Sequence, residues 1–119
     1  MFVLKGLLRA ESQEKILIYL LSRESGYGKG IADFFGLSQN ATQKQLARLE
    51  NDGIVVSKLV GKLREFRLNP RYPFREQLRE LLKAALKAYP DSVRKDLTME
   101  RSRPRQAGKP TVSARSASD

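Results

Sequence analysis

Apolar side chains recur every three or four residues along much of the chain, which is the spacing of helices that bury one face. This pattern predicts a short amphipathic helix over residues 2–10 and a second helix over residues 13–23, with Ser12 as its cap. It also predicts a last helix over residues 74–89, whose apolar stripe lies opposite a charged face. Pro73 marks the break in the chain before this last helix.

Between the second and the last helix, one part of the chain has the pattern of β-strands. Residues 54–60 are rich in apolar and β-branched side chains, and residues 63–69 alternate between apolar and polar ones. Residues 61–62 form a short turn between them, so the sequence predicts a β-hairpin. The glycine-rich residues 25–30 follow a helix rather than a buried strand, which favours a connector over a phosphate-binding loop. This connector has room for a brief strand at Tyr27.

Residues 31–56 predict a short helix, a tight turn, a longer helix and the start of a strand. Gly36 can adopt the positive φ that the turn requires. Ser38 or Asn40 can cap the longer helix with a side-chain oxygen, and Gly53 is a natural stop after it.

The longer helix separates apolar residues from amides and cations. Leu46 and Leu49 fall on the core side together with Thr42. The outward side chains are Gln39, Asn40, Gln43, Lys44 and Arg48. A helix needs amides to contact base edges and cations to hold guanine or phosphate in a DNA groove. The sequence therefore predicts a helix-turn-helix, with recognition by the helix over about residues 39–50.

The charge balance supports a nucleic-acid partner. The chain of 119 residues has 23 Lys and Arg against 13 Asp and Glu, a net charge of +10, and such a surplus favours polyanions. It has no cysteine and no histidine, which removes thiolate metal sites, the commonest general base and the commonest metal ligand, although carboxylates alone could still bind a hard cation such as magnesium. We therefore expect no enzyme, no cofactor and no metal site. The longest apolar run, residues 16–21, is too short to cross a membrane, so we expect no membrane association and a cytoplasmic protein, nucleoid-associated when bound to DNA.

Residues 31–56 resemble the winged helix-turn-helix of ArsR-like and MarR-like regulators of bacteria and archaea, which share IA-x-x-x-GLSQ and a helix that ends L-x-x-L-x-x-x-G-[IL]-V. The matching residues are Ile31, Ala32, Gly36, Leu37, Ser38, Gln39, Leu46, Leu49, Gly53, Ile54 and Val55. The resemblance implies that the start of the second helix lies in the major groove, with the wing around Lys62 and Arg64 on the flanking backbone or minor groove. Thr42 stands where such helices often have valine, and the metal ligands of the metal-sensing members are missing.

We thus expect a mainly α fold with a small β-hairpin. Residues 1–90 are expected to form a winged helix-turn-helix domain with N- and C-terminal packing or dimerisation helices. Residues 91–119 are expected to form a basic, disordered tail, with at most one frayed helical turn around residues 93–99. The expected DNA-binding residues are Ser38, Gln39, Asn40, Gln43, Lys44, Arg48, Lys58, Lys62 and Arg64. The expected dimer-interface residues are Phe2, Leu4, Leu7, Leu8, Phe74, Leu78, Leu81, Leu82, Ala85 and Tyr89. The alternative for these apolar stripes is packing on their own domain.

The favoured function is a homodimeric regulator of transcription that binds double-stranded DNA sequence-specifically, with repression as the favoured outcome. The alternative is a protein-interaction module, either an adaptor or an antitoxin-like partner. Residues 69–74, at the entry to the last helix, also resemble winged helices associated with nucleotidyltransferases. In this alternative the terminal helices contact a different protein, and DNA binding is weak and indifferent to sequence.

Overall fold

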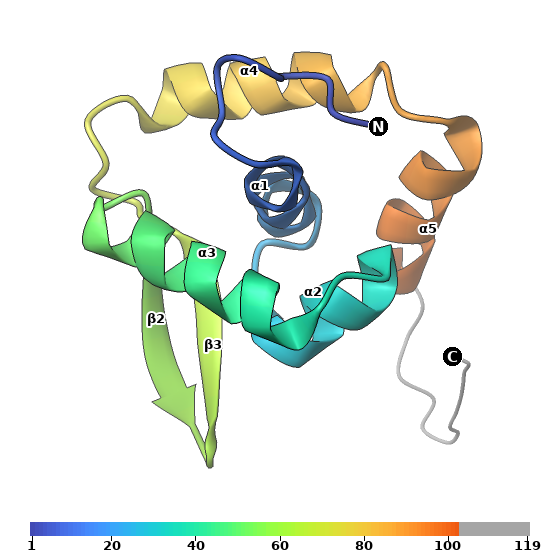
Figure 1. The fold of residues 1–119 in the computed structure, drawn as a ribbon. Helices are drawn as coiled ribbons and strands as arrows, with labels where there is room; N and C mark the ends of the chain where they lie inside the picture. Colours follow the sequence, from blue (N-terminus) through green and yellow to red (C-terminus); the bar gives the residue numbers. More distant parts are fainter. Residues whose placement is uncertain (103–119) are drawn as a thin grey trace.

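The computed structural model describes the backbone of residues 1–102 and the side chains of residues 1–98. Within this range the chain forms five helices and a three-stranded antiparallel sheet (Figure 1). The elements are α1 (Glu11–Arg23), β1 (Gly26–Tyr27), α2 (Gly28–Phe35), α3 (Gln39–Asn51), β2 (Val55–Val60), β3 (Leu63–Leu68), α4 (Arg75–Leu86) and α5 (Asp91–Ser102). The expectation of a mainly α fold with a small hairpin is confirmed at this level.

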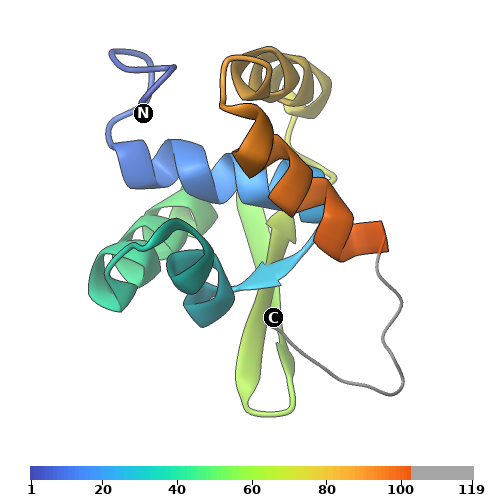
Figure 2. The same ribbon diagram turned by 90° about the vertical axis from the view of Figure 1, so that its right-hand side faces the viewer.

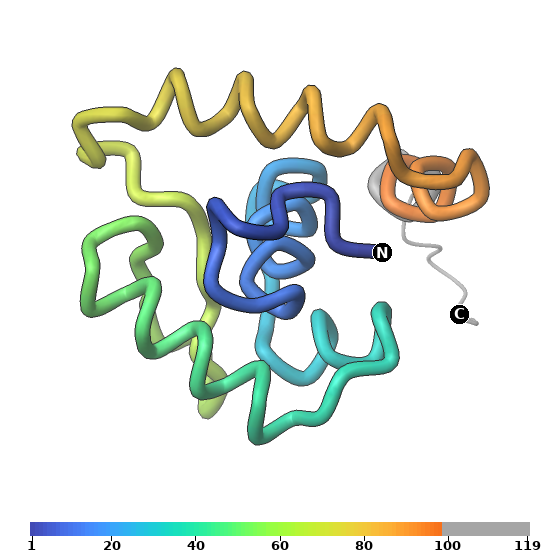
Figure 3. The backbone as a smooth tube through the Cα atoms, turned by 45° about the horizontal axis from the view of Figure 1, so that its top comes forward, coloured from blue at the N-terminus to red at the C-terminus, as the bar shows by residue number. Residues whose placement is uncertain are grey.

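Helix α1 lies at the centre of the molecule. Figures 1 and 3 show it surrounded by α2, α3, α4, α5 and the N-terminal segment. Every side chain from Ile16 to Leu21 is buried. Because consecutive residues point to all sides of a helix, this part of α1 is covered all the way round. None of the five helices is long and apolar enough to cross a membrane, among the residues that the structure covers.

The sheet has the strand order β1-β3-β2, and its longer part is the predicted hairpin. The register runs from Val55 opposite Leu68 to Val60 opposite Leu63, so two residues form the turn. Gly61 takes a φ of 65° there, which glycine adopts without strain. The brief strand expected at Tyr27 is present as β1, paired with β3. The free end of the hairpin projects well beyond the helices (Figure 2).

The turn between α2 and α3 follows the local sequence signals. Gly36 ends α2 with a φ of 68°, and its N–H donates to carbonyl groups in the last turn of that helix. Ser38, rather than Asn40, is the N-cap of α3, because the Ser38 hydroxyl accepts a hydrogen bond of 3.0 Å from the Ala41 N–H. Helix α2 begins at Gly28, so part of the expected connector is its first turn.

The helix expected over residues 2–10 is absent, and this prediction was wrong. The segment forms turns with an isolated bridge between Lys5 and Leu8, and Gly6 takes a φ of 93° that no helix contains. The side chain of Glu14 accepts hydrogen bonds from the backbone N–H groups of Val3 and Leu4. The carboxyl group of Glu14 thus accepts the backbone hydrogen bonds that carbonyl groups of the segment itself would accept in a helix. Helix α1 also begins at Glu11, before the expected cap.

Glu14 joins three separate parts of the fold. Its side chain is fully buried, and besides the N-terminal segment it accepts a hydrogen bond of 2.5 Å from the Tyr89 hydroxyl. Tyr89 follows the end of α4 and is 4% exposed. Because a buried carboxyl group without partners is costly, these donors are what permit an acidic residue at the centre of the core.

The apolar stripe of α4 faces α1, which overturns part of the expected dimer interface. Leu82, Ala85 and Tyr89 are buried in the core of their own chain, and Leu78 packs against that core. These side chains are therefore not available to a second copy in this fold. Leu4 and Leu8 also pack partly on the core, and Phe2 is half-buried. The expected interface residues that remain exposed are Leu7, Phe74 and Leu81.

The expected disorder from residue 91 was also wrong for residues 91–102, which form α5. Leu97 is fully buried, and Val93 packs against the core one turn earlier. Arg23 at the end of α1 donates hydrogen bonds of 3.1 Å to the carbonyl groups of Leu97 and Asp96. The compact unit therefore extends past residue 90, and the rest of the expected tail, residues 103–119, lies outside the described residues.

We predict that Tyr89→Phe lowers the free energy of unfolding by about 2 kcal/mol at neutral pH, because the variant loses a hydrogen bond to a buried carboxyl group. Burial raises the pKa of the Tyr89 phenol above its ordinary value of 10.0, and the hydrogen bond to Glu14 raises it further. The unfolded chain therefore loses this proton from about pH 10 upward while the folded chain keeps it, so stability falls as the pH rises.

Urea unfolding of both proteins between pH 7 and pH 11 measures these two effects. The difference in stability between the wild type and Tyr89→Phe should shrink above pH 10. A constant difference at all pH values would show that Tyr89 does not keep its proton in the folded state.

Candidate nucleic-acid interface

The outward face of α3 is exposed as the sequence predicts. Ser38, Gln39, Asn40, Gln43, Lys44 and Arg48 are all exposed. Leu46 and Leu49 are buried on the opposite side of the helix. Thr42 is buried as well, and its hydroxyl donates a hydrogen bond of 2.9 Å to the Ser38 carbonyl. The hydroxyl at the edge of the core is thus satisfied within the helix, so a polar residue is tolerated there.

No acidic residue lies between Asp33 and Glu50, so the exposed side chains from Ser38 to Arg48 are one hydroxyl, three amides, two alanines and two cations. Asp33 pairs with Lys29 on α2, with a distance of 2.9 Å between Nζ and Oδ2. Glu50 accepts a hydrogen bond of 2.7 Å from the Ser57 hydroxyl, which directs it toward the hairpin. The first turn of α3 also contains no acid, so the partial positive charge of the helix N-terminus is not offset. The part of the face from Ser38 to Arg48 therefore favours an anionic partner.

Gln43 has a neighbour that the sequence did not reveal. A Cβ atom at Gly28 would overlap Nε2 of Gln43 and come within 3.0 Å of its Cδ. The Gln43 amide thus rests against the first residue of α2, in the space that a side chain at Gly28 would take. This contact holds the amide close to α2 while the residue stays exposed.

A chain of hydrogen bonds connects α3 to the hairpin. The Ser57 hydroxyl on β2 donates to Glu50 on α3 and accepts a hydrogen bond of 3.0 Å from the Arg64 guanidinium on β3. Arg64 therefore has a structural partner, whereas the sequence suggested only a phosphate contact. In Figure 1, α3 and the projecting hairpin lie on the side of α1 opposite α4. The bonds fix the hairpin relative to α3, so both elements can face one extended partner.

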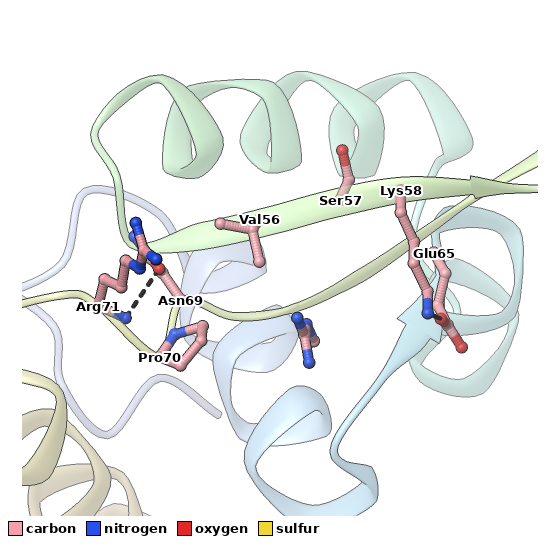
Figure 4. A pocket seen from close by; sticks show the side chains of 8 residues that line it. Val56, Ser57, Lys58, Glu65, Asn69, Pro70 and Arg71 are labelled. Carbon is pink, nitrogen blue, oxygen red and sulfur yellow. Dashed lines mark hydrogen bonds and ion pairs between the residues drawn. The ribbon is translucent and has the colours of Figure 1, made fainter.

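The hairpin also contributes a cation on the face turned away from α3 and another in its turn. Lys58 and Lys62 are exposed, and Nζ of Lys58 lies 4.0 Å from a carboxylate oxygen of Glu65. Figure 4 shows the Lys58 side chain reaching toward Glu65, away from α3, while Ser57 points toward that helix. Exposed pairs at this distance are weak, so the pair leaves Lys58 able to contact another anion.

A hollow of about 270 Å³ lies beside Lys58 at the base of the hairpin. Its lining residues are Val56, Ser57, Lys58, Glu65, Arg67, Asn69, Pro70 and Arg71 (Figure 4). Three of these are cations and one is an acid, which suits an anionic group such as a phosphate. Asn69 shapes the wall, because its Oδ1 accepts a hydrogen bond of 2.9 Å from the Arg71 N–H and its Nδ2 donates to the Gly53 carbonyl.

Arg71 was missing from the residues expected to bind DNA. It follows Pro70 in the turn after β3, and the pairing of β2 with β3 brings it and Lys58 to opposite ends of the same hollow (Figure 4). Arg67 was missing from those residues as well. It lies between Phe66 and Leu68 in the alternating pattern of β3, which was the available signal that its side chain faces the opposite side of the hairpin from theirs. No group of three or more acidic side chains within the described residues could hold a metal ion.

Comparisons with protein-family models, with curated proteins and with solved structures gave no match to this chain.

We predict that Gly28→Ala displaces the Gln43 side chain without unfolding the protein. The atom nearest to the new methyl group is the end of a flexible side chain, and alanine is the better residue within a helix. The side-chain amide signals of Gln43 in an NMR spectrum should shift, while the melting temperature changes little.

Gly30→Ala is the matched control, because a Cβ there meets nothing closer than the Tyr19 hydroxyl at 3.9 Å. This variant should leave the Gln43 signals in place. Equal shifts in both variants, or none in Gly28→Ala, would contradict the contact between Gln43 and Gly28.

Proposed function

We propose that this chain is a transcriptional regulator of the winged helix-turn-helix type that binds double-stranded DNA sequence-specifically. In this proposal α2 and α3 are the helix-turn-helix, α3 lies in the major groove, and the β2–β3 hairpin is the wing. The observation that carries it is the exposed face of α3, which contains no acid from Gln39 to Leu49 and is held beside a cationic hairpin by the bonds among Glu50, Ser57 and Arg64. The net charge of +10 supplies the long-range attraction to a polyanion.

The side chains of α3 suit direct contacts with bases. The major groove is about 12 Å wide and admits an α-helix. Asn40 and Gln43 carry amides that can pair with the edge of adenine, while Lys44 and Arg48 suit guanine or phosphate. Ser38 and Gln39 at the N-terminus of α3 are placed to contact the backbone, where helix N–H groups favour phosphate. Specificity then comes from the amides and affinity mainly from the cations.

We further propose that the wing cations hold the flanking backbone. Lys62 lies in the hairpin turn, and Lys58 with Arg67 and Arg71 surrounds the hollow at its base. Each phosphate contact releases counterions, so the logarithm of the binding constant should fall by about 0.9 per log unit of salt for each contact. Bound at a promoter, such a protein would block transcription, which makes repression the favoured outcome.

The proposed regulator is a homodimer whose interface is smaller than the apolar stripe of α4 suggested. Phe74 at the start of α4 and Leu81 within α4 are both exposed and lie seven residues apart. The Tyr72 ring packs edge-on against Phe74, with 5.9 Å between the ring centroids. This surface can pair with its copy across a two-fold axis. Two α3 helices would then contact half-sites about 34 Å apart.

The same surface gives the protein-interaction module its support. Phe74 and Leu81 could equally contact a different protein, as an adaptor or antitoxin-like partner would. This alternative needs no specific DNA site, and it leaves the amides of α3 without a role.

Selection from random double-stranded oligonucleotides with the full chain distinguishes these functions. We expect enrichment of a two-fold-symmetric motif whose binding weakens steeply between 50 and about 200 mM salt. A pool that never enriches, with equal binding to all sequences, would contradict the regulator and favour the interaction module. Enrichment of a single half-site would retain DNA recognition and contradict the dimer.

We predict that one substitution on α3 weakens binding selectively and that one in the hairpin weakens it uniformly. Gln43→Ala should cost about 1–3 kcal/mol on the selected site and relax the preference at one base pair, because the amide contacts a base edge. Lys62→Ala should weaken binding to all sequences alike and lower the salt slope by about 0.9, because it contacts a phosphate.

Fluorescence anisotropy with the selected site and with single-base variants, at several salt concentrations, measures both effects. A uniform loss for Gln43→Ala would remove that residue from base contacts. Unchanged binding for Lys62→Ala would remove the hairpin turn from the interface.

A further inference from the structure

The free end of the hairpin is apolar as well as cationic. Leu59 is 63% exposed, Leu63 is 58% exposed and Val60 is 43% exposed. These three residues flank the two-residue turn, since Val60 pairs with Leu63 immediately before it. Three large apolar side chains kept in water at one projecting point are unfavourable unless another surface covers them.

The apolar side chains lie on both faces of the hairpin. Successive residues of a strand point to opposite faces, and paired residues share a face. Leu59 therefore shares a face with Ser57, which points toward α3, while Val60 and Leu63 lie on the opposite face with Lys58. A flat partner would cover only one of these faces. The tip suits a narrow groove whose two walls contact both faces at once.

The charge around the tip indicates what kind of groove this is. Lys58, Lys62 and Arg64 surround the three apolar residues, and no acid occurs from residue 53 to residue 64. The partner should therefore have anionic rims and a less polar interior. The minor groove of DNA has both, with phosphates along its edges and sugars and base edges inside. The bonds that fix the hairpin to α3 favour the same partner for both elements.

We propose that the hairpin tip enters the minor groove as an apolar wedge and bends the DNA. Leu59 and Leu63 would contact the two walls of the groove or part a base step, while Lys62 and Arg64 neutralise the phosphates on either side. Apolar side chains inserted in this way kink the duplex by about 20–90° toward the major groove. This inference rests on the proposed DNA binding and adds a deformation of the DNA, so the preferred site should contain flexible steps near the wing.

The double variant Leu59→Ala/Leu63→Ala tests the wedge. Both side chains are exposed, so the variant should fold as the wild type does, with an unchanged circular dichroism spectrum and melting temperature. A duplex carrying the selected site, labelled at its two ends, reports bending by energy transfer. The wild type should raise the transfer, and the double variant should give less than about half of that rise, with roughly tenfold weaker binding.

The salt dependence separates an apolar contact from an ionic one. The salt slope of the double variant should equal that of the wild type, because no cation is lost. Ser92→Ala is the control, since Ser92 is an exposed, uncharged residue of α5 outside the proposed DNA-binding and dimer surfaces. This control should bend DNA as the wild type does.

Three other results would overturn the wedge. Specific binding by the wild type without a change in energy transfer would leave the proposed regulator intact and remove the bending. Full bending by the double variant would remove the two leucines from the mechanism. Vesicles of anionic phospholipid that bind the wild type but not the double variant, when neither protein bends the DNA, would assign the tip to a membrane surface.

Discussion

Helix α1 is buried on every side, and the rest of the fold is arranged around it. Its run of apolar residues from Ile16 to Leu21 can be covered only if α2, α3, α4, α5 and the sheet pack against different sides of the same helix. Glu14 lies in the same helix, and its carboxyl group accepts hydrogen bonds from the backbone of the N-terminal segment and from the Tyr89 hydroxyl. The central helix thus supplies both the apolar contacts and the polar attachment points of the molecule.

The segments that could be predicted from the sequence are those set by neighbouring residues. Gly36, Ser38 and Gly61 impose their turns and caps within a few residues, so α2, α3 and the hairpin were correctly expected. The N-terminal segment and α5 were predicted wrongly because their partners lie far along the chain. Glu14 is 11 residues from Val3, and Arg23 is 74 residues from Leu97.

In the candidate site, too, the features set by neighbouring residues could be predicted, and those set by distant segments could not. The helical period placed the exposed residues of α3 correctly, because one face of a helix is fixed by spacing alone. Spacing could not show that Gln43 rests on Gly28, that Arg64 bonds to Ser57, or that Arg71 joins the cations of the hairpin. It also showed that one side of α4 is apolar without showing that α1 covers it. Each of these depends on which segments pack together.

The anchoring of α5 affects how the protein can be handled in the laboratory. Composition alone places the end of the domain near Pro90, and a gene shortened there would appear to remove only a polar extension. Such a shortening would take away Leu97, which is fully buried, and the two carbonyl groups that receive the Arg23 guanidinium. The guanidinium also lies over the rings of Tyr19 and Phe34, so its loosening would reach the aromatic contacts between α1 and α2. A shortened gene should therefore keep residues 91–102, which form α5.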